Sequence, residues 1–220
     1  MQSLDRILLS AKADAKLQSI IDDHLRKDGV SSTLVVGFTF KEEKGDYPAF
    51  SLGGQMLNFP IGVVCVSDGL LRTLTYEQLE FVVLHELGHI LNNHWAANLI
   101  ILLAKDFIVE QLAKAFGTSI EKAKENLGLI KACLSLFGVR AGRIEEEIKA
   151  KNELEADRYA VIHQGRKDPA ISVLSLLTAG NVSTPTHVTV DGSFTFPIVT
   201  AEERIEAIRN LILLGDRRGQ

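Results

Sequence analysis

Cysteine is scarce in this 220-residue sequence, which contains only Cys65 and Cys133. Two cysteines are too few for the disulfide framework that holds many small secreted proteins together. The first residues, Met1 to Asp5, also lack the basic and apolar stretches of a secretory signal peptide. These two absences favour a cytoplasmic location.

An excess of basic residues is absent as well. The sequence has 24 lysines and arginines against 28 aspartates and glutamates, which gives a net charge of −4. A chain of this charge has no electrostatic basis for binding nucleic acid or an anionic membrane surface. We therefore expect no nucleic-acid partner.

The sequence also lacks an apolar run long enough to cross a membrane. Lys105 and Asp106 interrupt the apolar segment 99–104, and Lys131 interrupts the segment 129–139. Both segments are far shorter than the ~20 residues that a spanning helix needs, so we expect a soluble protein without a membrane span. Burial in the core, a helical lid and a homo-oligomer contact are the open alternatives for these two segments.

A serine or cysteine nucleophile is poorly supported. The sequence has no Gly-x-Ser-x-Gly motif, and neither cysteine has the sequence context of a catalytic dyad. Repeats and glycine-rich phosphate loops are missing too. At 220 residues the chain is long enough for one sizeable core, and 46% hydrophobic and 24% charged residues are typical of a globular domain. We expect a single domain over residues 1–220.

The sequence does contain the motif His-Glu-Leu-Gly-His, at residues 85–89. On a helix, His85 and His89 lie about 40° apart around the axis and one turn apart along it, so both imidazoles can reach one metal ion. Glu86 is then placed to hydrogen-bond a metal-bound water, as the general base of a metallopeptidase does. The apolar residues 81–84 before the motif indicate a core helix, where these polar side chains would be costly without partners.

A third metal ligand is expected downstream, at Glu153. Glu153 and Asp157 are separated by one helical turn and share one helix face. Glu153 can complete a site of two histidines and one glutamate that keeps a fourth position for water, and Asp157 can accept the free N–H of a ligand imidazole. The acidic residues 145–147 are interpreted instead as a solvated face. We expect a single zinc ion per chain.

These residues resemble the gluzincin zinc peptidases, and within them the HtpX and CaaX prenyl protease group of family M48. The matching stretches are, in order, residues 49–54, residues 64–71, the motif at 85–89, Glu153 with Asp157, and residues 202–205. The resemblance implies an α+β, zincin-like metallopeptidase fold that is mostly helical, with a small sheet bordering the cleft. It also implies a zinc-dependent endopeptidase that acts on a peptide or an unfolded protein.

The same resemblance implies a residue that stabilises the oxyanion, near a histidine and an arginine ahead of the final helix. This chain keeps Arg204 but departs at the histidine, where Phe196 or Ile198 stands, depending on the alignment. We expect Arg204, with or without His187, to face the oxyanion, with Tyr159 as the next candidate. The departure favours the alternative function, a zinc-bound but catalytically weak or latent relative that acts as a regulatory or binding module.

The other histidines are not expected to bind the metal. If the motif helix continues, His94 lies about 140° around the axis from His89. The metzincin pattern would also need its third histidine where Trp95 stands. His24 and His163 are interpreted as surface histidines or as histidines with satisfied hydrogen bonds. A metal-free structural helix is the remaining alternative for the motif.

Hydrophobic periodicity and capping signals predict a mostly helical chain with one small sheet. The predicted elements are a helix at 3–27 and strands at 32–40, 49–52 and 61–66 within residues 1–74, the active-site helix at about 75–95, helices at 95–116 and 118–128, the second metal helix at about 141–163, a helix at 168–180, and a hairpin and a final helix within 186–214. The strand at 61–66, ahead of the motif helix, is expected to border the cleft with an open edge that pairs with an extended substrate.

Overall fold

The computed structural model of the chain describes residues 11–30, 34–41, 48–56, 59–94, 119, 122, 143–178, 187–188, 194–195 and 199–212. The chain divides into two compact units, Met1–Trp95 with Ala150–Gln220, and Ala96–Lys149. Most described residues lie in the first unit, whose fold is given below. The single domain over residues 1–220 stays a prediction.

Several predicted elements fall outside this part of the chain. The helices predicted at 95–116 and 118–128 lie outside the described residues, apart from residues 119 and 122. The apolar segments 99–104 and 129–139 lie outside them entirely, so the homo-oligomer contact stays a prediction. Among the described residues, no helix combines the length and the apolarity needed to span a membrane.

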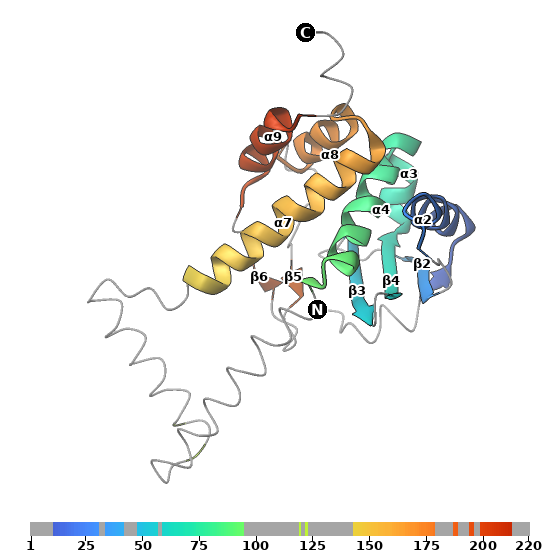
Figure 1. Cartoon of the computed structure of the whole chain (residues 1–220), viewed down its shortest axis with the longest axis horizontal. Coiled ribbons are helices and arrows are strands. Elements are labelled where there is room, and N and C mark those ends of the chain that lie inside the picture. The colour runs from blue at the N-terminus through green and yellow to red at the C-terminus, as the bar shows by residue number, and fades with distance from the viewer. Residues whose placement is uncertain are drawn as a thin grey trace. The chain divides into compact units, whose positions relative to one another are not determined.

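A four-stranded sheet forms one layer of the first unit (Figure 1). Its strands are β1 (Lys12–Ala13), β2 (Val35–Phe40), β3 (Ala49–Met56) and β4 (Phe59–Ser67), in the spatial order β1-β2-β4-β3. β2 and β4 run parallel, and the other neighbouring pairs are antiparallel. The strands predicted at 32–40, 49–52 and 61–66 are confirmed, and β3 and β4 extend beyond the predicted residues.

The prediction of which strand has an open edge is wrong. β4 lies between β2 and β3 and pairs with both, so it has no free edge. Among the described residues, β3 pairs with β4 on one side and with no strand on the other. Strand patterns in the sequence could not show the spatial order of the strands, because β2 pairs with β4 and not with β3, the next strand along the chain.

The helix predicted at 3–27 is confirmed only from residue 15 onward, and its part at 3–10 lies outside the described residues. α2 spans Ala15–Lys27, and Lys12–Ala13 form β1 instead of a helical turn. Asp14 separates the two elements, because its side chain accepts hydrogen bonds from the backbone N–H groups of Lys16 and Leu17, at 2.9 and 3.0 Å. A side chain that binds these free N–H groups caps the helix and stops it from extending backwards.

The motif residues 85–89 lie on α4 (Tyr76–Leu91), which follows the short, unpredicted helix α3 (Asp68–Thr73). α4 begins with a capping box, in which Thr75 and Gln78 each bind the other's backbone N–H group. The helix ends at Leu91, a few residues before the predicted end, and Asn93 then adopts a left-handed backbone with φ 57°.

Three helices and a hairpin make up the C-terminal part of the described chain. The helices are α7 (Arg143–Gln164), α8 (Asp168–Thr178) and α9 (Ala201–Asn210), close to their predicted positions. A capping box of Thr200 and Glu203 begins α9. The predicted hairpin is confirmed, because β5 (His187–Val188) pairs antiparallel with β6 (Phe194–Thr195).

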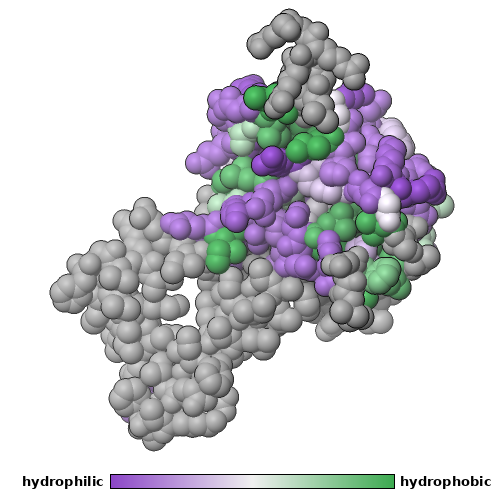
Figure 2. Space-filling model, viewed as in Figure 1, coloured by the Kyte–Doolittle hydropathy of each residue, from purple (hydrophilic) through white to green (hydrophobic). Residues whose placement is uncertain are grey.

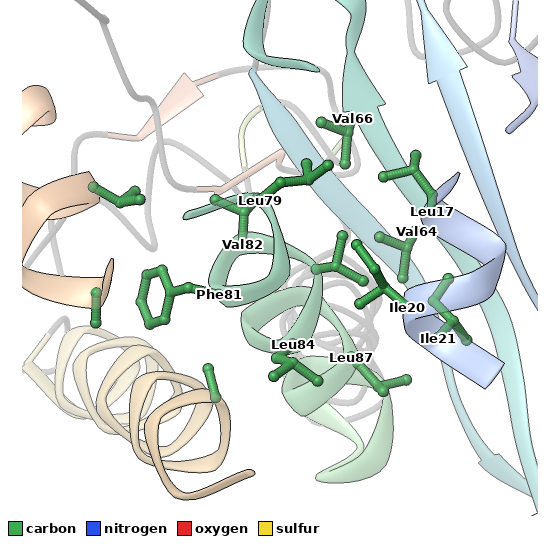
Figure 3. Packing of buried hydrophobic residues seen from close by; sticks show 14 of the residues in the cluster. Leu17, Ile20, Ile21, Val64, Val66, Leu79, Phe81, Val82, Leu84 and Leu87 are labelled. Carbon is green, nitrogen blue, oxygen red and sulfur yellow. The ribbon is translucent and has the colours of Figure 1, made fainter. Parts of the chain in front are cut away.

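α4 is central to the hydrophobic core (Figure 3). It packs against β3, β4 and α2, and it also packs against α8, which in turn contacts α9. Buried residues of this cluster include Leu17, Ile20 and Ile21 of α2, Val64 and Val66 of β4, and Leu79, Leu84 and Leu87 of α4. Burying a side chain of this size contributes about 1.5–3 kcal/mol, so the core holds α4 firmly in place.

The surface of the described residues mixes polar and apolar side chains. On the face shown in Figure 2, hydrophobic groups are interrupted by hydrophilic ones. The large exposed hydrophobic residues are Leu34, Phe59, Tyr76, Ile162 and Ile212. They come from different parts of the fold, and single exposed apolar residues are ordinary on protein surfaces.

Candidate metal centre

α4 and α7 bring three side chains together that could bind a metal ion. His85 and His89 lie on α4, and Glu153 lies on α7. His85 Nε2 is 3.1 Å from His89 Nε2 and 3.5 Å from Glu153 Oε2, and His89 Nε2 is 3.4 Å from Glu153 Oε1. One nitrogen or oxygen atom from each residue can thus face a common point.

These distances fit a tetrahedral metal ion. Zinc binds histidine nitrogen and carboxylate oxygen at about 2.0–2.2 Å, so tetrahedral geometry places neighbouring ligand atoms about 3.3–3.6 Å apart. The observed separations are in this range or slightly below it. Two histidines and a glutamate are also a donor set of catalytic zinc sites that keep a fourth position open. The side chains present therefore fit the predicted ion.

A glycine on α4 allows the two helices to approach this closely. A Cβ atom on Gly88 would lie 3.1 Å from the Cα atom of Ala156 and 3.3 Å from the Cβ atom of Tyr159, both on α7. Ordinary contacts between carbon atoms are about 3.5–4.0 Å long. The small residues Gly88 and Ala156 therefore set the helix separation at which Glu153 reaches both histidines.

Asp157 and Arg204 lie behind the three candidate ligands. Asp157 Oδ1 is 2.9 Å from His85 Nδ1. Arg204 of α9 donates from Nε and Nη2 to the two oxygens of Asp157, each at 2.7 Å, and its Nη1 lies 3.1 Å from Glu153 Oε2. One buried guanidinium therefore links the carboxylates of Glu153 and Asp157, and the oxyanion role expected for Arg204 stays a prediction.

The opposite charges change the protonation of these buried groups. Burial opposes a proton on His85, but hydrogen bonds to Asp157 and Glu153 outweigh it and raise the pKa of His85 to about 10. Burial also opposes ionisation of the two carboxylates, and the charge of Arg204 nevertheless lowers the pKa of both. Glu153 and Asp157 are therefore ionised at neutral pH. A metal ion that binds His85 has to displace a proton, because histidine ligates in its neutral form.

Glu86 follows His85 on α4 and contacts the edge strand β3. It is buried, and its Oε2 accepts a 2.8 Å hydrogen bond from the hydroxyl group of Ser51 on β3. Ser51 lies within the matched residues 49–54, but nothing in that stretch of sequence indicates a contact with Glu86. Burial, followed by the charge of Glu86, raises the pKa of Cys65 to about 12, so this thiol stays protonated at neutral pH.

His94 lies closer to the site than predicted. Its Nδ1 is 2.8 Å from His89 Nδ1, and its Nε2 is 3.2 Å from Glu155 Oε2. The predicted angle of about 140° assumed a continuing helix, whereas α4 ends at Leu91 and Asn93 reverses the chain. The Asn92-Asn93 pair is the signal that could have indicated this turn, because asparagine is one of the residues that tolerate a left-handed helix end. Burial lowers the pKa of His94 to about 4, so the ring is neutral.

The remaining candidates lie elsewhere or are not described. The Tyr159 hydroxyl donates a 2.9 Å hydrogen bond to Asp28 Oδ2 beside α2, and its role at the oxyanion stays a prediction. His24 Nε2 lies 2.9 Å from a carboxylate oxygen of Glu80, and His163 stacks on the Tyr159 ring. The backbone of His187 pairs in β5, but its side chain lies outside the described residues, so its role stays a prediction.

Comparison with known proteins points to the same family. The model of peptidase family M48 matches residues 11–212. The chain is 29% identical over 146 residues to the protease HtpX homolog of Paracidovorax citrulli (strain AAC00-1). The matched region covers 61% of this chain and 49% of that protein. It is 27% identical over 189 residues to protease HtpX of Haemophilus influenzae (strain PittEE), with coverages of 76% and 64%. The chain thus spans less than two thirds of the length of these relatives.

A solved structure shares the fold. The crystal structure of S. mikatae Ste24p matches with a TM-score of 0.62 and 21% identity, over 90% of this chain and 50% of that chain. At this identity the likeness concerns the fold alone, and it agrees with a helix-rich chain containing a small mixed sheet. Because the family model covers nearly the whole sequence, this chain belongs to peptidase family M48.

Proposed function

We propose that the chain is a zinc-dependent endopeptidase with Glu86 as its general base. The observation that carries the proposal is the grouping of His85, His89 and Glu153 at metal-ligand spacing, with Glu86 beside His85 on α4. Membership of family M48, and the naming of similar proteins as proteases, support the same class of reaction. Cytoplasmic location is part of the proposal.

The proposed chemistry divides the work among the buried side chains. His85, His89 and Glu153 would hold the ion, which when bound would supply polarisation of the scissile carbonyl and a water whose pKa is lowered toward ~7. Glu86 takes the proton of the attacking water and passes it to the leaving amine. The hydrogen bond from Ser51 fixes the orientation of the Glu86 carboxylate for both transfers.

We propose that Arg204 positions the metal ligands rather than the oxyanion. Asp157 accepts the Nδ1–H group of His85 and leaves Nε2 of that ring for the metal. Arg204 in turn holds Asp157 with two hydrogen bonds and holds Glu153 with a third contact. His187 stays a candidate for the oxyanion in this proposal.

The outer edge of β3 is the proposed place for the substrate. Among the described strands β3 is at the edge of the sheet, and Ser51 on this strand contacts Glu86. An extended peptide that pairs with a sheet edge takes its affinity from main-chain hydrogen bonds. Such binding requires a substrate segment with free backbone groups, which an unfolded protein supplies.

A test of this function is the cleavage of casein before and after metal removal. We expect the purified protein to cleave casein, to lose this activity in a strong chelator, and to regain it when zinc is added back in equal amount. Circular dichroism of the chelated protein checks that the fold is retained. Cleavage that continues after metal analysis shows complete removal would contradict the proposal, and zinc-loaded protein that cleaves no peptide would favour the regulatory alternative.

A further inference from the structure

We infer that His94 is a positioning residue for the metal ligand His89, and that Glu155 supports His94 in turn. The inference rests on the proposed zinc site, because it concerns one of the three ligands of that site. No role for His94 follows from the motif at residues 85–89. It follows from the contacts at the end of α4.

The three side chains form a hydrogen-bonded series. His89 Nδ1 and His94 Nδ1 are 2.8 Å apart, and His94 Nε2 is 3.2 Å from Glu155 Oε2. The two rings meet edge to face, with centroids 4.9 Å apart and planes at 73°. His94 is 4% exposed, whereas the Glu155 side chain is 42% exposed and lies 3.5 Å from Lys151 Nζ. The series therefore leads from the metal ligand to the surface of α7.

The positions of the protons follow from the donor chemistry. A histidine that ligates through Nε2 carries its proton on Nδ1, so His89 donates to His94. Only one proton fits between the two Nδ1 atoms, so His94 accepts there and carries its own proton on Nε2. That proton is donated to Glu155. Each hydrogen bond therefore selects the tautomer of the next ring, and the tautomer of His89 is the one that leaves Nε2 for the metal.

Each of the two histidine ligands thus has a hydrogen-bond partner at Nδ1, but the two partners differ in chemistry. His85 Nδ1 faces the carboxylate of Asp157 at 2.9 Å, and His89 Nδ1 faces the imidazole of His94 at 2.8 Å. Partners of this kind fix the ring orientation of a ligand histidine, and their loss commonly costs about 10–100-fold in metal affinity.

The turn that brings His94 back to His89 is held independently of this contact. Asn93 has φ 57°, and its side-chain oxygen accepts a hydrogen bond from the backbone N–H of Gln55 on β3. The Gln55 side chain also donates a 2.6 Å hydrogen bond to the carbonyl oxygen of Leu91. The edge strand therefore fixes the end of α4, and His94 is placed before any metal binds.

The test compares zinc affinity in full-length variants, measured by competition with a chromogenic chelator. His94→Phe keeps a buried ring but cannot accept a hydrogen bond, and we expect it to weaken zinc binding about 10–100-fold. His94→Gln keeps an acceptor and should recover most of the loss. The visible absorption of bound Co²⁺ should change in His94→Phe and return toward the wild-type spectrum in His94→Gln.

A matched control separates positioning from general destabilisation. His24→Phe removes another buried histidine, whose Nε2 contacts Glu80, and it should leave zinc affinity unchanged even where the melting temperature falls. Equal zinc affinity in His94→Phe and the wild type overturns the inference while the proposed function stands. Wild-type protein that binds no zinc overturns both.

Glu155→Ala provides a second variant, at a partly exposed position where folding is not at risk. We expect it to weaken zinc binding severalfold, because His94 then loses the acceptor that selects its tautomer. If His94→Phe does not fold, an unchanged zinc affinity in folded Glu155→Ala overturns the inference, because the supporting role of Glu155 is then absent.

Discussion

Replacing Glu86 with glutamine should abolish cleavage of casein while zinc content and fold stay as in the wild type. Glutamine has nearly the same shape and can still accept the hydrogen bond from Ser51, but its amide does not take a proton from water. Positioned general bases contribute about 10²–10⁴-fold to rate, so we expect a loss of that size in kcat. Initial rates on zinc-loaded protein, with metal analysis of the same samples, give the measurement.

The matched control for this substitution is Glu202→Gln, which makes the same chemical change at an exposed position on α9. It should retain full activity. A Glu86→Gln enzyme that cleaves casein at the wild-type rate would show that another group accepts the proton. Loss of zinc from Glu86→Gln would instead mean that the side chain contributes to the metal site itself.

Arg204→Ala should lower thermal stability and zinc affinity together. The change leaves the buried carboxylates of Asp157 and Glu153 without their shared cation. Removing one partner of a buried ion pair costs about 3–5 kcal/mol, which corresponds to a fall of roughly 10 °C in melting temperature for a chain of this size. Thermal unfolding followed by circular dichroism and zinc competition give the two measurements.

Two further variants help to interpret the effects of Arg204→Ala. Arg204→Lys keeps a positive charge but cannot hold both oxygens of Asp157 through one planar group, so its effects should be intermediate. Arg209→Ala, at an exposed position of the same helix, should change neither quantity. A fall in kcat with stability and zinc affinity unchanged would support the oxyanion role that the sequence predicted for Arg204.

The candidate ligands were predictable because they depend on helical periodicity alone. Any regular helix through residues 85–89 places the two histidines on one face, and the same holds for Glu153 and Asp157 on a second helix. The start of α4 was also predictable, since the side chain of Thr75 caps a backbone group only three residues away. Each of these features is local in the sequence.

The features that were not predicted depend on contacts between distant segments or on where an element ends. The position of β3 at the sheet edge depends on the pairing of β2 with β4, which the strand patterns do not encode. The contact of Arg204 with Asp157 depends on how α9 packs beside α7. The contact of His94 with His89 depends on the end of α4, where Asn93 adopts a left-handed backbone and Gln55 of the distant strand β3 holds the turn.

The zinc content of purified wild-type protein and of Glu153→Ala tests the central claim most directly. With His85, His89 and Glu153 as the three ligands, the wild type should contain about one zinc ion per chain, and Glu153→Ala should lose most of it on dialysis. Circular dichroism of the variant checks that its helices are retained. Full zinc occupancy in a folded Glu153→Ala protein would contradict the assignment of the metal site to α4 and α7.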